Sequence, residues 1–129
     1  MSETNNFLIH KHKTANPHYD FYLQIGDQLW FWIIPNGIPS NKKEKKVAIQ
    51  NEFCKSSIGE IESEKEVEDS YGVGKIEKWD KGFFEVETSK NIKIIIEAKG
   101  DKLKGKYLFH VPNWGIWTKK RLWTIEKIR

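Results

Sequence analysis

The clearest structural signal in this chain is the stretch Tyr19-Asp-Phe-Tyr-Leu-Gln-Ile-Gly-Asp-Gln-Leu-Trp-Phe-Trp-Ile-Ile34. Between Tyr19 and Ile25, apolar and polar residues alternate, which is typical of a half-buried β-strand. Gly26 and Asp27 suit a two-residue turn, and Gln28–Ile34 predicts a second strand. The stretch as a whole therefore predicts a β-hairpin.

The same patterns along the rest of the chain predict a mainly β protein. Further strands are expected over Phe7–His12, Val47–Gln50, Gly74–Trp79, Gly82–Glu87, Ile92–Ala98, Leu103–Phe109 and Trp117–Glu126. Residues 80–82 and 99–102 are expected to form hairpin turns. Many short strands with regular turns indicate a barrel or a sandwich. The acidic stretch Ser57–Ser70 is expected to be a short helix or a loop.

Three consecutive aromatic residues, Trp30, Phe31 and Trp32, place rings on both faces of the second strand of the hairpin. One of these faces belongs to the core. The other is either a second packing surface or an exposed platform on which a base could stack.

His12, His18 and Asp20 are the main candidates for a functional site. Residues two apart on a strand share a face, about 6–7 Å apart, so His18 and Asp20 can converge on one ion. Two imidazoles and a carboxylate can bind a divalent metal and leave coordination positions open, as catalytic metal sites do. A polar strand face without a metal is the alternative. The single cysteine cannot build a thiolate zinc site.

The segment Lys11-His-Lys-Thr-Ala-Asn-Pro-His-Tyr-Asp-Phe-Tyr-Leu23 has the pattern K-H-x5-H-Y-D-F-x-L. Further blocks follow it in order at Trp32–Pro39, Lys45–Ile49, Tyr71–Gly82, Leu103–Tyr107 and Leu122–Lys127. In this order the blocks resemble the 3′-phosphoesterase domain of bacterial DNA ligase D and its stand-alone archaeal relatives. No block is specific alone, whereas five or six in the right order are.

The resemblance implies a small closed antiparallel β-barrel with a short flanking helix or loops and a groove on its outside. It implies that His12, His18 and Asp20 hold a catalytic divalent metal, with manganese expected and zinc as the alternative. Histidine and carboxylate ligands suit both ions. It also implies removal of a 3′-phosphate or a 3′-terminal ribonucleotide from a DNA strand, which leaves a 3′-OH for a ligase.

Several positions depart from the pattern of this family. Tyr22 stands where the family has a phosphate-holding Arg, and Asn36 stands where it has Lys. Lys46 replaces an Arg and is expected to remain as a catalytic phosphate contact, although it lacks the bidentate fork. Cys54 and Ile58 replace a His and a Tyr of the family site. Because one charged transition-state donor can be worth about 10²–10³ in rate, these departures weaken the expected catalysis.

Basic residues gather before the strand at Val47–Gln50. We expect contacts with the nucleic-acid backbone from Lys42, Lys43, Lys45 and Lys46. The formal net charge of +4 permits a polyanionic partner without requiring one. A solvated lysine-rich loop is the alternative.

The length of 129 residues predicts one domain, residues 1–129, and the polar residues 1–6 are expected to be flexible. No apolar run reaches 18 residues, so neither a transmembrane helix nor a membrane partner is expected. A single cysteine excludes an internal disulfide and fits a reducing compartment. With no apolar leader at the N-terminus, a cytoplasmic protein is expected.

Two functions remain open. The first is a metal-dependent 3′-phosphoesterase that trims DNA or RNA–DNA 3′ ends in end-joining repair. The second is a catalytically weakened relative that binds nucleic-acid ends or a repair partner, such as a DNA ligase or an end-bridging protein. The intact triad favours the first function, and the missing Arg, His and Tyr favour the second.

Overall fold

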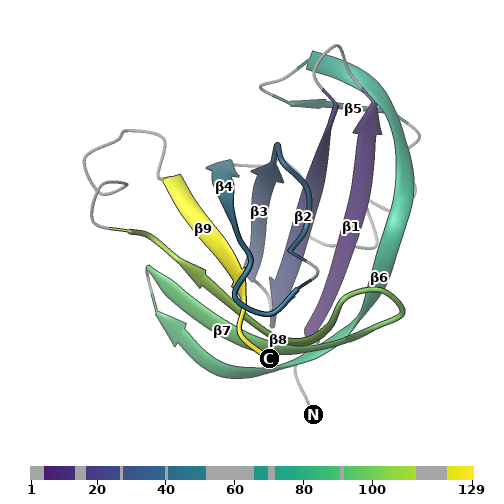
Figure 1. Ribbon diagram of the computed structural model, residues 1–129. Coiled ribbons are helices and arrows are strands. Elements are labelled where there is room, and N and C mark those ends of the chain that lie inside the picture. The colour runs from purple at the N-terminus through teal and green to yellow at the C-terminus, as the bar shows by residue number, and fades with distance from the viewer. Residues whose placement is uncertain are drawn as a thin grey trace.

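The computed structural model describes residues 5–13, 17–26, 28–39, 41–51, 66–69, 72–90, 92–112 and 122–129. These residues form nine strands and no helix, which confirms the prediction of a mainly β protein (Figure 1). The strands are β1 Asn5–Lys13, β2 His18–Ile25, β3 Gln28–Ile34, β4 Lys45–Asn51, β5 Glu66–Asp69, β6 Gly72–Lys90, β7 Lys93–Gly100, β8 Lys104–His110 and β9 Leu122–Lys127. Within these ranges, no helix has the length and apolar character needed to cross a membrane.

All nine strands belong to one sheet in the order β1-β2-β3-β4-β9-β8-β7-β6-β5, and every pairing is antiparallel. The additional pairing of β6 with β1 closes eight of them into a barrel (Figure 1). The long strand β6 makes this closure, because residues 75–83 pair with β1 and residues 82–90 pair with β7. The small closed barrel is therefore confirmed, and the sandwich is not the fold.

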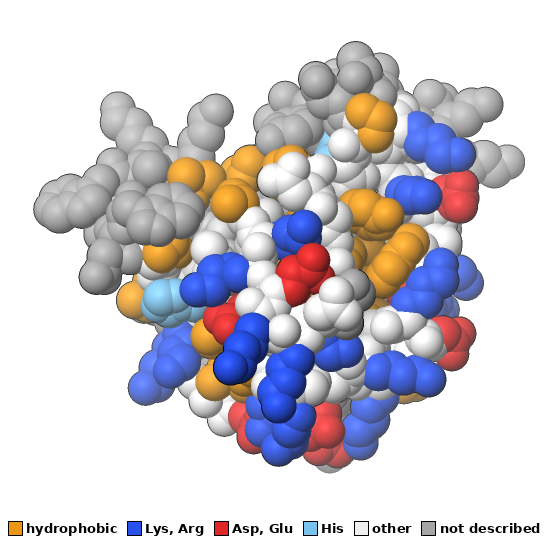
Figure 2. Space-filling model, viewed as in Figure 1, with side chains coloured by type: hydrophobic (Ala, Val, Ile, Leu, Met, Phe, Trp, Pro, Cys, Tyr) orange, Lys and Arg blue, Asp and Glu red, His pale blue; other side chains and the backbone are white. Residues whose placement is uncertain are grey.

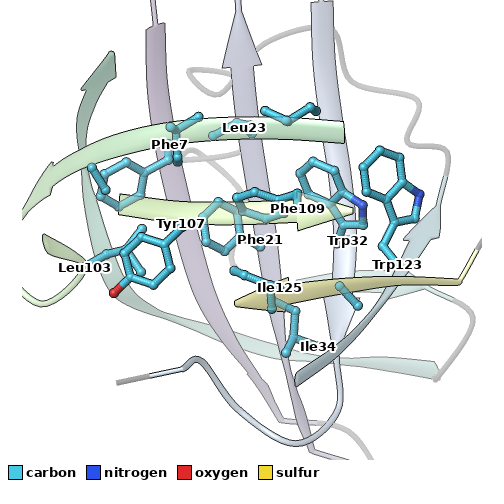
Figure 3. Packing of buried hydrophobic residues seen from close by; sticks show 14 of the residues in the cluster. Phe7, Phe21, Leu23, Trp32, Ile34, Leu103, Tyr107, Phe109, Trp123 and Ile125 are labelled. Atoms are coloured by element: carbon cyan, nitrogen blue, oxygen red, sulfur yellow. The ribbon is translucent and has the colours of Figure 1, made fainter. Parts of the chain in front are cut away.

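Large aromatic side chains fill the interior of the barrel (Figure 3). Trp32 stacks on Phe109 with ring centroids 4.6 Å apart and meets Trp123 edge-on at 5.4 Å. Phe7 and Phe21 lie 6.1 Å apart beside them. These residues alternate along their strands with residues that face outward, as a barrel wall requires.

The outer face of β1, β2 and β3 is buried as well. Leu8, Tyr22, Phe31 and Ile33 form a second apolar cluster there, and none of them is more than 2% exposed. Phe31 thus belongs to a second packing surface and not to an exposed platform. Burial on both faces explains why β3 reads as a continuous apolar run from Leu29 to Ile34, and it makes β2 more buried than the half-buried strand predicted from its alternation.

The predicted hairpin turn at residues 80–82 is wrong, because β6 runs without interruption through them. Asp80 is buried and accepts backbone N–H bonds from Asp101, Lys102 and Leu103 in the β7–β8 turn, at 3.2, 2.9 and 2.8 Å. At Gly82, an added Cβ would lie 2.7 Å from the carbonyl oxygen of Lys99. Asp80 and Gly82 therefore do not form a turn; Asp80 binds the β7–β8 turn, and Gly82 lets β6 lie close to β7.

Other boundaries follow the sequence more closely. The β2–β3 turn is confirmed by the pairing of Ile25 with Gln28, and the turn at 99–102 by the bond from Gly100 N–H to the Leu103 carbonyl. The acidic stretch 57–70 contains strand β5, because Glu66–Asp69 pairs with the start of β6, and the rest of that stretch lies outside the described residues. Residues 117–121 of the predicted last strand also lie outside them, and β1 begins at Asn5, within the segment expected to be flexible.

Candidate metal centre

The β1–β2 hairpin positions His12, His18 and Asp20. His12 pairs directly with His18, and Asp20 lies two residues further along β2 on the same face. Ile9 and Phe21 belong to the interior cluster, so the alternating residues of the triad face the outside of the barrel. The expectation that His18 and Asp20 lie on one face thus matches their placement, and the hairpin register adds His12 beside them.

The ligand atoms of the triad converge closely. His12 Nδ1 lies 3.0 Å from Asp20 Oδ2, and His18 Nε2 lies 3.0 Å from Asp20 Oδ1. The two imidazole nitrogens are 3.2 Å apart. Ligands bound at about 2.0–2.2 Å to a divalent ion lie roughly 3 Å from one another, so these separations fit a shared cation. Among the described residues, these three form the group of His, Cys, Asp and Glu side chains that could hold a metal.

The triad is almost completely shielded from solvent, with 0%, 2% and 0% exposure for His12, His18 and Asp20. Burial alone would raise the pKa of Asp20, but hydrogen bonding and charge attraction to His12 and His18 outweigh it and hold this pKa below the usual value. Each Asp20 oxygen therefore faces one imidazole nitrogen at 3.0 Å. A buried carboxylate needs a compensating positive charge, and a cation between the three side chains would supply it.

A family model described as the DNA ligase D 3′-phosphoesterase domain matches residues 10–110. The chain belongs to this family. It is 29% identical over 122 residues to the multifunctional non-homologous end joining DNA repair protein LigD of Mycobacterium tuberculosis, which covers 92% of the chain and 16% of that protein. The LigD protein of Pseudomonas aeruginosa is 24% identical over 128 residues, covering 95% of the chain and 15% of that protein. The chain therefore spans a small part of these relatives.

Tyr22, at the position of the Arg in the DNA ligase D family pattern, lies on the same outer face as the triad. It is fully buried and stacks on Phe31 with ring centroids 4.8 Å apart and planes 13° apart. His10 meets the Tyr22 ring edge-on at 5.6 Å and is only 4% exposed. An aromatic packing contact therefore occupies the place of a cation, and His10 packs beside the triad without joining its ligand group.

The lysines expected to contact nucleic acid lie on β4 and the turn before it. Lys46 lies on the inward-facing side of its strand, opposite Ile125, and its Nζ is 3.6 Å from a Glu44 carboxylate oxygen. The register does not bring it to the triad. Lys42, Lys43 and Lys45 are exposed, and Lys45 approaches Glu126 at 3.8 Å. Figure 2 shows lysines and arginines gathered over the lower part of one face, with acidic side chains between them.

One cation beside the site was missed in the sequence. Lys78 of β6 is exposed and pairs directly with His10, on the other side of β1 from Asp20. A β-bulge between Ile9 and His10 sets this register, since Ile9 pairs with Asp80 and Trp79 is the extra residue. No residue pattern marks such a bulge in advance, so the neighbourhood of Lys78 becomes visible only in the folded barrel.

Proposed function

We propose that this chain is a metal-dependent 3′-phosphoesterase that removes a 3′-phosphate or a 3′-terminal ribonucleotide from DNA or RNA–DNA ends during end-joining repair. The observation that carries the proposal is the convergence of His12, His18 and Asp20 within 3.0–3.2 Å on the outer face of the barrel. Membership of the DNA ligase D 3′-phosphoesterase family supports the same chemistry. Residues 1–129 would act as one domain.

Each residue of the triad has a defined part in this proposal. His12 through Nδ1, His18 through Nε2 and Asp20 through its carboxylate would hold the ion, with Mn²⁺ expected before Zn²⁺. When bound, the ion would polarise a phosphate oxygen and lower the pKa of a water molecule. Both imidazoles must be neutral at these nitrogens, so proton uptake competes with the metal. In the hydrolysis, a water oxygen bonds to phosphorus while the bond to the 3′ oxygen breaks, and that oxygen takes a proton to become the 3′-OH.

A second function is favoured by the aromatic contact at Tyr22. Its ring stacks on Phe31 and leaves no cation at the position of the family Arg. The alternative is a weakened relative that binds nucleic-acid ends or a repair partner, such as a DNA ligase or an end-bridging protein, without turning over. In that case the triad would hold an ion that positions a phosphate.

The deciding experiment is a primer-template assay with Mn²⁺ that scores removal of a 3′-phosphate and of a 3′-terminal ribonucleotide. His18→Ala is the test variant, and His110→Ala is the matched control because His110 lies at the end of β8, outside the triad group. Turnover that is lost in His18→Ala and kept in His110→Ala would establish the phosphoesterase. Binding without turnover in a gel shift would support the alternative function, and equal turnover in both variants would exclude the triad from catalysis.

A further inference from the structure

We propose that the outward side of β6, formed by Lys78, Lys81 and Phe83, is a track that guides a single-stranded 3′ end to the metal centre. This inference rests on the proposed function and names the surface that holds its substrate. Lys78, Lys81 and Phe83 pair across the β1–β6 ladder with His10, Leu8 and Asn6, respectively. All three therefore lie beside β1 on the same outer face as the triad.

The spacing suits a nucleic-acid strand. Four residues separate His10 from Asn6, which is about 13 Å along β1. That length corresponds to about four stacked nucleotides, at about 3.4 Å each. Lys78 stands at the end nearer to the triad, because its partner His10 is also the partner of Asp20 on the other side of β1. The two lysines would contact phosphates, and the 3′ end would point toward the buried triad.

Phe83 supplies a place for a base. Its side chain is 68% exposed, which makes it the most exposed large hydrophobic residue of the described chain. It borders a surface hollow of about 340 Å³ that is also lined by Asn6, Lys81, Gly82 and Asp101. Gly82 lines the hollow without a side chain, and a Cβ there would meet the Lys99 carbonyl at 2.7 Å. An exposed ring next to lysines is how proteins bind single strands without sequence preference.

Charge also delimits the track. No described carboxylate lies within ion-pair distance of Lys78, whereas the next outward residue after Phe83 is Glu85, which binds Lys99 at 2.9 Å. Asp101 on the rim of the hollow carries the opposite sign, so a phosphate would sit on the side of Lys81. Lysines beside one exposed ring fit a nucleic-acid strand with an unpaired 3′ end, such as the frayed end of a primer, better than a protein partner.

The test is a fluorescence anisotropy titration of the full chain with a short single-stranded oligonucleotide that carries a 3′-phosphate. Phe83→Ala should weaken binding about 5- to 140-fold, as loss of one stacked base predicts, and Phe83→Trp should restore it. Lys78→Ala with Lys81→Ala should reduce the slope of log affinity against log salt by about 1.4, for two single-strand phosphate contacts. A 2-aminopurine base near the 3′ end should lose its quenching in Phe83→Ala.

The chain provides matched controls. Ile92→Ala removes another exposed apolar side chain, 46% exposed, and Lys90→Ala with Lys93→Ala removes two exposed lysines from the far end of β6 and from β7. Both controls should bind as the unmodified protein does. Wild-type affinity and salt slope in the Phe83 and Lys78/Lys81 variants would overturn the proposal. So would a change of oligomeric state in Phe83→Ala with oligonucleotide affinity unchanged.

Failure of the track and failure of the proposed function give different results. The binding titrations can be repeated in the His18→Ala background. If oligonucleotide affinity still depends on Phe83 there, while the unmodified protein shows no turnover, the track stands and the phosphoesterase proposal fails. If turnover depends on His18 but neither binding nor turnover depends on Phe83, Lys78 or Lys81, the phosphoesterase stands and the track fails.

Discussion

Asp80 is expected to be the most sensitive polar residue for stability in this barrel. Its carboxylate is 5% exposed and accepts backbone N–H bonds from Lys81, Asp101, Lys102 and Leu103 at 2.8–3.2 Å. Three of these donors belong to the β7–β8 turn, so one side chain ties that turn to the middle of β6. Substitution Asp80→Ala would leave these donors without their acceptor.

The expected magnitude follows from the number of lost bonds. A hydrogen bond to a charged group contributes about 1.5–3 kcal/mol, and a buried donor left unsatisfied costs about 1–3 kcal/mol. Leu103 N–H is buried, whereas water can reach the other donors of the turn in part. We therefore expect Asp80→Ala to lower the free energy of unfolding by about 3–5 kcal/mol. Asp80→Asn keeps one acceptor oxygen and should cost about half as much.

Urea unfolding followed by tryptophan fluorescence measures this effect, since the chain has six tryptophans. Asp101→Asn is the matched control, because this neighbouring carboxylate is exposed and should change stability by no more than about 0.5 kcal/mol. The slope of the transition should stay constant across the variants. A loss below about 1 kcal/mol in Asp80→Ala would show that the turn does not depend on this carboxylate.

Three other properties can be tested. Asp20→Asn removes the charge from the triad at nearly constant size. Substitutions of residues that only hydrogen-bond a metal ligand lower metal affinity by about 10- to 100-fold, so loss of the Asp20 charge should lower Mn²⁺ affinity in calorimetry by more than that. Equal affinity would exclude Asp20 as a ligand. Gly82→Ala should lower the free energy of unfolding by about 1–3 kcal/mol in urea, because its Cβ would meet the Lys99 carbonyl at 2.7 Å, and an unchanged midpoint would contradict this packing. Burial, with the nearby charge of Asp80, raises the pKa of Tyr107 to about 12, so the folded protein keeps this proton above pH 10, where the unfolded chain loses it. Stability should therefore decline as pH rises from about 10 to 12, and Tyr107→Phe should remove this part of the decline in unfolding experiments at each pH.

The strands were predictable wherever a local pattern sets them. Gln28–Ile34 matches its predicted bounds because alternation and a two-residue turn lie within one hairpin. The sequence predicted two strands in place of β6, because Asp80 and Gly82 are residue types that form turns. Their actual partners in the β7–β8 turn lie some twenty residues away in the sequence. β5 was missed because its acidic sequence carries no strand pattern, and only its pairing with the start of β6 makes it a strand.

The residues of the candidate site also divide into those that a local pattern predicts and those that only long-range pairing places. His18 and Asp20 share a face by strand parity alone, and the hairpin register adds His12 opposite His18. The position of Lys46 depended on which face of β4 points inward, and only the register with β9 supplies that information. The nearness of Lys78 to the triad depends on a bulge and on barrel closure, which are long-range features.

The outer face suggests how this member of the family could compensate the charge of a phosphate. On the β3 side of the triad, the stacked pair Tyr22 and Phe31 is neutral and fully packed. A bound divalent cation would outweigh the single negative charge of Asp20 and leave the centre positive toward an incoming phosphate. On the β6 side, the register brings Lys78 next to His10 at the exposed edge of the same face. On this face, positive charge therefore lies at the exposed strand edge of Lys78 and not at the buried position of Tyr22.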